Sequence, residues 1–284
     1  MARGTAIQPV DIERPTLDLS GEGLRAILAT MIKGSEDHGG IERYVDAVKL
    51  KNSMFQQALC DGAVDNLDLD AFKGLCTFMS TVRRRVGNWL TGDAFDDMHE
   101  GIRELFTEDV DVDARIGRFC ARFPQDKRHR WVRDLATELL HNADPERIPL
   151  MNRWVWDATA NTGVIREIWH GDNVDHMTIP VGDGFGTYLM LREELSQFLS
   201  DEGVFRDVLQ YVDILCAQAY AQYICEQGGS YLRADFSAPE DPMQHTRRLL
   251  GLDGVQAGSG KTRLKTIDGD AFLLDAEEPS EQAH

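Results

Sequence analysis

Apolar residues recur at helical spacing through most of the chain, and this pattern constrains the fold more than any other feature. In the stretch 20–33, Leu24, Ile27, Leu28 and Ile32 fall three or four residues apart, which is the spacing of one face of an amphipathic helix. Similar patterns cover 40–60, 68–90, 94–106, 111–123 and 125–143, and they return in 185–200 and 204–227. The joints between them are short and polar, so the sequence predicts a mainly α, multi-helix assembly.

The periodicity changes between residues 150 and 182. The runs "NRWVWD" (152–157) and "VIREIW" (164–169) are rich in aromatic and β-branched residues, and the turn-forming sequence "ATANTG" separates them. This composition is typical of strands joined by a tight turn. We therefore expect a small antiparallel hairpin or meander near 150–182, with 177–181 as a candidate third strand and with Trp154 and Trp156 on one face, packed against the helices.

Four regions follow from these patterns. Residues 1–18 are expected to form a flexible N-terminal arm, 19–146 a helical region, and 147–252 the hairpin together with further core helices. Gly228 and Gly229 are expected to end the helix that begins near 204. Residues 253–284 contain a linker, a short hairpin around Asp268-Gly269 and a polar, acidic tail that we expect to be disordered.

Net charge and cysteine usage restrict the class of protein. The formal net charge of −18 favours solubility and repels nucleic acid and anionic membranes, unless a local basic surface overrides it. The most apolar stretch, 204–225, contains Arg206, Asp207 and Asp213, which an ordinary membrane helix would exclude. The five cysteines include no C-x-x-C pair and lie in helical stretches, so reduced thiols and a cytoplasmic location are expected.

The segment "GVQAGSGKT" (254–262) ends like a phosphate-binding P-loop. A complete motif would require glycine at position 255, where this chain has Val255, and the loop would have to follow a strand and open a helix. The sequence that follows, "RLKTIDG", instead indicates a strand and a turn. We interpret the segment as a linker, and we expect no bound nucleotide.

Two groups of residues have the chemistry of metal ligands. His170, Asp172, Asp175 and His176 lie within seven residues of one another, and imidazole and carboxylate groups suit zinc, iron or manganese. Glu138 and His141 form an i, i+3 pair, which is half of what a helical dinuclear site requires. The alternatives are turn formation by the Asp residues of the first group and a favourable helix C-terminal position for His141. The sequence identifies no cofactor, and a divalent metal is the one type for which it offers ligands.

The strongest local departure from the overall composition is basic. Residues 115–133 contain seven Arg or Lys and one acidic residue. We consider six of them candidate partner-binding residues: Arg115, Arg118, Arg122, Lys127, Arg128 and Arg130. Arg83, Arg84 and Arg85 are candidates to extend the group. Two hypotheses remain open: an exposed surface for an anionic partner, or arginines that pair with neighbouring carboxylates of the same chain.

No nucleophile–base, metal or nucleotide motif of good specificity is present, so the leading hypothesis is a cytosolic accessory or adaptor protein that acts through protein–protein interaction. One alternative is a metal-dependent enzyme that uses the 170–183 loop or the helical carboxylate–histidine pairs. Another is a nucleic-acid-associated protein that docks through residues 115–133. The sequence leaves open whether the protein is an enzyme.

Overall fold

The computed structural model describes residues 14–171, 174–231, 242–252, 261–265 and 271–275. These residues form ten α-helices, three short 3-10 helices and two strands. The first helices and 3-10 turns are α1 (Gly21–Glu36), α2 (Ile41–Leu59), η1 (Ala63–Asn66), α3 (Leu69–Thr77), η2 (Val86–Trp89), α4 (Gly92–Leu105), α5 (Val112–Ala121) and α6 (Trp131–Ala143). They are followed by α7 (Val164–Glu167), η3 (Val174–His176), α8 (Phe185–Asp201), α9 (Val208–Tyr231), α10 (Pro242–Leu249), β1 (Lys261–Lys265) and β2 (Ala271–Asp275). The predicted mainly α class is confirmed.

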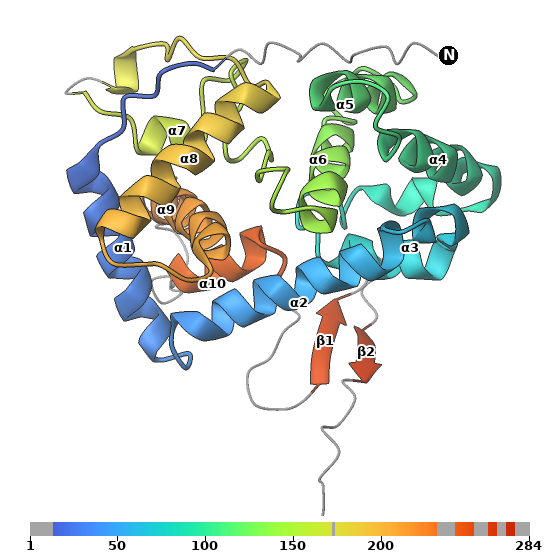
Figure 1. Cartoon of the computed structure of the whole chain (residues 1–284), viewed down its shortest axis with the longest axis horizontal. Helices are drawn as coiled ribbons and strands as arrows, with labels where there is room; N and C mark the ends of the chain where they lie inside the picture. The colour runs from blue at the N-terminus through green and yellow to red at the C-terminus, as the bar shows by residue number, and fades with distance from the viewer. Residues whose placement is uncertain (1–13, 172–173, 232–241, 253–260, 266–270, 276–284) are drawn as a thin grey trace, which may run out of the picture.

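The helices lie in two groups that α2 connects (Figure 1). Helices α3, α4, α5 and α6 form one group, and α1, α7, α8, α9 and α10 form the other, while α2 runs beneath both. Helix α2 packs against both α6 and α9. The place where α2, α6 and α9 meet is therefore the junction of the two groups.

Short polar side chains begin three of the helices. Ser20, Asp68 and Asp111 each accept a hydrogen bond from the backbone amide three residues later, at 3.2, 2.8 and 2.8 Å. Such caps satisfy amides that have no partner inside the helix. They explain why α1, α3 and α5 begin where they do.

Two helices are buried around almost their entire circumference. In α9 every residue from Tyr211 to Ala219 is buried, and in α6 every residue except Arg133 is buried. Such a helix has no solvated face, so its polar side chains must find partners inside the protein. The prediction that Gly228 and Gly229 end α9 is wrong, because the helix continues to Tyr231.

The hairpin predicted near 150–182 is also wrong, since no strand forms among the described residues of this range. The turn itself exists: Asp157 and Thr162 exchange two backbone hydrogen bonds, and Gly163 has a φ of 124°. Beyond the turn, Val164, Ile165 and Ile168 are all buried, and the spacing i, i+1, i+4 is helical. The chain coils into α7 because this spacing buries all three side chains, whereas a strand would expose one of two neighbours.

Residues 152–157, which precede the turn, do not form a strand for the same reason. Trp154, Val155 and Trp156 are consecutive, and all three are buried, whereas a strand at the surface of the protein would alternate. The indole nitrogen of Trp156 donates to the carbonyl of Val181 at 3.2 Å. The tryptophans do pack in the core as expected, but through an irregular segment.

Helix α3 ends at Thr77 rather than continuing to residue 90 as predicted. The chain after Phe78 forms turns that bring it against the end of α10. There Gly251 has a φ of 72°, and a Cβ atom at this position would lie 1.8 Å from the carbonyl oxygen of Phe78. Only glycine permits this close backbone approach.

The C-terminal strands β1 and β2 pair antiparallel, with Leu264 opposite Phe272. Lys261 and Thr262 lie in β1, where a P-loop would have the first turn of a helix. The expected turn at Asp268-Gly269, the 276–284 tail and most of the 1–18 arm lie outside the described residues. In the part of the chain that the structure describes, no helix is both long and apolar enough to cross a membrane.

Candidate functional site

Polar and charged side chains are buried together at the junction of α2, α6 and α9. All are at most 6% exposed, and we refer to them as the junction network. Its members are Lys51, Asn52, Glu138, His141, Asn142, Asn152 and Asp213. They come from three helices and from the segment after α6, and they lie up to 162 residues apart in the sequence.

Lys51 and Glu138 form the first ion pair of the network. The Lys51 ammonium donates to Glu138 Oε2 at 3.0 Å and to the carbonyl oxygen of Leu250, also at 3.0 Å. The other carboxylate oxygen of Glu138 accepts from Asn152 Nδ2 at 3.0 Å. Both oxygens of a buried carboxylate are thus satisfied, which is the condition for tolerating a charge away from water.

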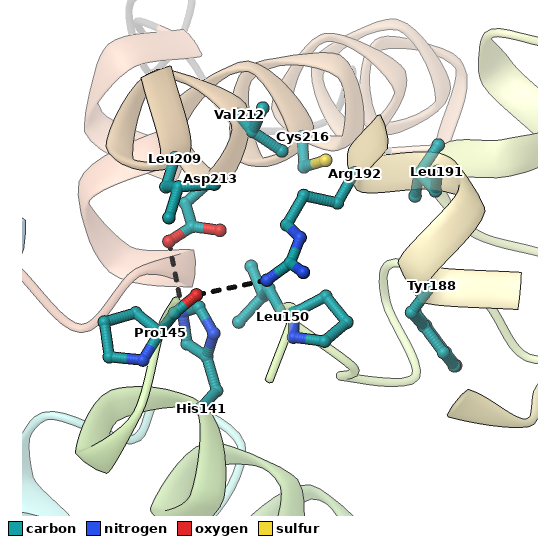
Figure 2. Close-up of a pocket in the computed structure, with 11 residues that line it drawn as sticks. His141, Pro145, Leu150, Tyr188, Leu191, Arg192, Leu209, Val212, Asp213 and Cys216 are labelled. Atoms are coloured by element: carbon teal, nitrogen blue, oxygen red, sulfur yellow. Dashed lines mark hydrogen bonds and ion pairs between the residues drawn. The ribbon is translucent and has the colours of Figure 1, made fainter. Parts of the chain in front are cut away.

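His141 and Asp213 form the second ion pair (Figure 2). The two side chains point toward each other from α6 and α9, with His141 Nε2 3.1 Å from Asp213 Oδ2. His141 Nδ1 lies 2.9 Å from the carbonyl oxygen of Ile148, which can only accept. Both ring nitrogens therefore face acceptors, and the imidazolium, which has two N–H donors, matches this environment.

The pKa of His141 follows from two opposing causes. Burial by itself lowers the pKa of the imidazolium, but the charge of Asp213 and the hydrogen bonds to Asp213 and Ile148 outweigh it, so the pKa is raised above its ordinary value. His141 thus favours the charged form in the folded protein. With both nitrogens engaged, the ring has no lone pair to offer a metal ion or a substrate proton.

The metal hypothesis for Glu138 and His141 stays a prediction, and the structure gives these two side chains other partners. The two side chains do project from adjacent turns of α6, as the i, i+3 spacing implies, but they contact different partners. Glu138 forms its ion pair with Lys51, and His141 forms its ion pair with Asp213. A cation between them would have to displace the Lys51 ammonium, which already supplies the positive charge.

Two small hollows adjoin the two ion pairs. Figure 2 shows the hollow between α6, α8 and α9, where Arg192 donates to the carbonyl of Pro145 at 3.2 Å. This hollow and the one beside Lys51 each have a free volume of about 10 Å³, which is near the lower limit for one water molecule. Neither of these two hollows has room for a substrate.

The second predicted metal group is placed only in part. His170 and His176 are exposed, and the backbone amide of His170 donates to the carbonyl of Asp18 at 2.8 Å. Asp172 and the side chain of Asp175 lie outside the described residues. Among the residues that the structure does describe, no group of three or more His, Cys, Asp or Glu side chains is arranged to share an ion.

The basic segment divides into two parts with different environments. In α5, Arg118 pairs with Asp109 at 2.9 Å, and Arg122, which follows the last residue of the helix, pairs with Glu104 at 3.1 Å. Arg115 is 5% exposed and donates to the carbonyl of Leu105 at 3.3 Å; its burial lowers the pKa of the guanidinium. These three candidate residues therefore bind partners within the chain itself.

The cations in the turn before α6 have a different environment from those at residues 115–122. Lys127, Arg128 and Arg130 are exposed, as are Arg84 and Arg85, and none of these five side chains forms an ion pair with another described residue. The segment that contains Arg84 and Arg85 meets the turn before α6 at Trp89. The centre of the Trp89 ring lies 6.0 Å from that of the His129 ring and 4.9 Å from that of the Phe123 ring. We refer to Arg84, Arg85, Trp89, Lys127, Arg128 and Arg130 as the basic surface.

One carboxylate, Asp126, belongs to the same turn. It accepts from the His129 ring at 2.9 Å and from the backbone amide of Arg128 at 2.7 Å, and the hydrogen bond from His129 lowers the pKa of Asp126. Asp126 therefore fixes the shape of the turn. It leaves the three neighbouring cations directed to solvent.

The sequence pointed to two members of the junction network, Glu138 and His141, but not to their partners Lys51 and Asp213. Lys51 and Asp213 look like solvated positions of amphipathic helices, and nothing in their local sequence indicates a partner. The one usable indication is in α6, where apolar residues occupy positions all round the helix, so that its polar residues are buried as well. All five cysteines are free thiols, and burial raises the pKa values of Cys76 and Cys216.

Comparisons of this chain with known protein families, with curated proteins and with solved structures find no match. The junction network and the basic surface are therefore the features from which a function can be inferred.

Proposed function

We propose that this protein is an accessory protein that binds an acidic segment of a partner protein through the basic surface. The observation that carries the proposal is the set of five exposed cations that form no ion pair with any described residue, in a chain of net charge −18. A chain so rich in carboxylates has partners available for its cations, and it uses them for Arg118 and Arg122. The five cations of the basic surface, unlike Arg118 and Arg122, form no ion pair with a described carboxylate.

The chemistry of the surface suits a carboxylate-bearing partner. Guanidinium groups bind carboxylates through two parallel hydrogen bonds, and four of the five cations are arginines. Trp89 is only partly buried and lies among them, so it offers an apolar contact of the kind that anchors protein interfaces. A positive surface on a negative molecule also steers an acidic partner toward one orientation.

A protein partner fits better than nucleic acid. A nucleic acid extends its charge far beyond a surface of five cations, and the rest of this molecule would repel it. A short acidic segment can bind the basic surface without meeting the remaining carboxylates. A cytoplasmic location, where free thiols persist, belongs to the same proposal.

The test uses a fluorescent peptide of glutamate residues and, separately, a single-stranded oligonucleotide of equal charge. We expect the wild-type protein to bind the peptide more tightly than the oligonucleotide, with an affinity that falls as salt is raised. The triple variant K127E/R128E/R130E should no longer bind the peptide. Tighter binding of the oligonucleotide would instead support a nucleic-acid-associated function.

A matched control is the triple variant K33E/R206E/R248E. These three cations are exposed, belong to α1, the α8–α9 loop and α10 in the other helix group (Figure 1), and give the same change in net charge. Equal loss of peptide binding in both triple variants would show that only the net charge matters, and the proposal would be wrong.

A further inference from the structure

The chain beyond α10 begins close to the basic surface. Leu252, which follows α10, is 2% exposed, so the start of the next segment is fixed in the protein. Ser80 Oγ donates to the carbonyl oxygen of Leu249 at 3.1 Å, which places the end of α10 beside the turns after α3. Arg84 follows Ser80 by four residues, and four residues span at most about 14 Å. The residues after 252 therefore begin near Arg84 and its neighbour Arg85, two members of the basic surface.

The C-terminal part of the sequence contains an acidic segment. Residues 276–284 include Glu277, Glu278 and Glu281 and have no Lys or Arg. Their carboxylates have the chemistry that the basic surface accepts, because guanidinium groups bind carboxylates through paired hydrogen bonds. The chain thus carries a segment of the same kind as the one proposed for the partner of this surface.

The pairing of β1 with β2 keeps the link between Leu252 and this segment short. Lys261 is opposite Asp275 in the register of the two strands, and paired strands lie about 5 Å apart. The link is therefore the nine-residue step from Leu252 to Lys261, which spans at most about 30 Å. The three glutamates lie two to six residues beyond Asp275, so they can reach Arg84 without any movement of the helices.

We infer that the 276–284 segment binds the basic surface of its own chain and competes there with the acidic segment of a partner protein. The inference rests on the proposed function of this surface and adds its regulation, since a partner has to displace the segment. A second copy of the chain is a poorer occupant, because two molecules of net charge −18 repel each other and its segment lacks the tether.

The tether determines how strong the competition is. A segment held by a short link has an effective concentration on the order of millimolar. Exposed ion pairs each contribute little, so we expect the 276–284 segment to bind weakly, with a dissociation constant also on the order of millimolar. At these values the segment occupies the surface in about half of the molecules.

The first test is the titration of the full chain with the fluorescent glutamate peptide, carried out on the variant E277Q/E278Q/E281Q. We expect this variant to bind the peptide about twofold more tightly than a control of equal net charge, because the competing carboxylates are gone. Equal affinities in the variant and the control would overturn the inference and leave the proposed function standing, since the peptide still binds.

The control is D46N/E194Q/E226Q. It neutralises three exposed carboxylates, which belong to α2, α8 and α9. Its net charge rises as much as that of E277Q/E278Q/E281Q, so any general effect of charge on peptide binding is the same in both.

Carbodiimide coupling tests the contact without any peptide, and it therefore decides the inference even if the proposed function fails. The reagent joins an ammonium group to a carboxylate in direct contact with it, and Lys127 is the one lysine of the basic surface. We expect mass spectrometry to find Lys127 linked to a glutamate of 276–284 within single chains. The link should be lost in R128E/R130E, which keeps Lys127 but reverses the charge around it. The inference is overturned if no link forms, if the link joins two chains, or if R128E/R130E gives an unchanged yield.

Discussion

The junction network and the basic surface both gather charged side chains, but they differ in how each charge is compensated. In the network, Lys51 lies 3.0 Å from Glu138 and His141 lies 3.1 Å from Asp213. In the basic surface, the five cations are exposed and have no carboxylate partner in the described part of the chain. Water stabilises an exposed charge, whereas a buried charge requires a partner at hydrogen-bond distance.

The difference shows that the environment, and not the residue type, decides what a charged side chain does. Lys49 and Lys51 are two residues apart in α2, yet their side chains are 44% and 6% exposed. Lys51 is held inside the protein by Glu138, whereas Lys49 pairs with Asp207 at the surface. The comparison predicts large stability effects for changes in the network and small ones for changes in the basic surface.

The largest effect is expected for Lys51→Met, which leaves the Glu138 carboxylate buried without its cation. Breaking a buried ion pair on one side costs about 3–5 kcal/mol. The loss should appear as a lower free energy of unfolding in urea denaturation. Removal of both charges in K51M/E138M should restore part of the stability, because no charge is then left unpaired, although the Leu250 carbonyl and Asn152 Nδ2 each lose a partner. A double variant as unstable as the single one would show that packing, and not charge, dominates at this position.

A smaller loss is expected for Arg115→Met in α5. Arg115 is buried and donates to the Leu105 carbonyl, so the change removes a donor and leaves that carbonyl unsatisfied without burying a new charge. The cost of such a group is about 1–3 kcal/mol, measurable by thermal and urea denaturation. By contrast, R118A and R122A remove exposed ion pairs, which contribute little, and should unfold almost like the wild type. Arg115→Met with wild-type stability would mean that this side chain is not held inside the protein.

Regular helices could be predicted from the sequence, but the contacts between them could not. The apolar spacing of residues 20–33 and the polar cap at Ser20 are local, so α1 followed directly from them. The pairing of Lys51 with Glu138 joins residues 87 apart, and no local pattern encodes it. The hairpin at 152–169 failed because β-branched and aromatic residues also suit a buried irregular segment, and only tertiary packing decides between the two.

The pH dependence of stability tests the second ion pair of the network. The pKa of His141 is raised in the folded protein, so the folded state binds its proton more tightly than the unfolded state does. The stabilisation is fully present below the unfolded pKa, about 6.5, and is lost as pH rises through the higher folded pKa. We expect the free energy of unfolding to decrease over this window, and the decrease to be absent in H141Q. A slope that persists in H141Q would assign the effect to another group.

The smallest stability effect is expected for the basic surface itself. K127E/R128E/R130E removes no ion pair between described residues, so the free energy of unfolding should stay within about 0.5 kcal/mol of the wild type. A slight loss can arise because the variant is more negative and repels itself. The control K33E/R206E/R248E carries the same extra charge and also places glutamate in the last turns of α1 and α10, which opposes the helix dipole. It should therefore lose at least as much stability, which urea denaturation of the two variants side by side will detect. If the surface variant is clearly less stable than the control, its cations have partners inside the chain, and the surface is not free for an acidic segment of another protein.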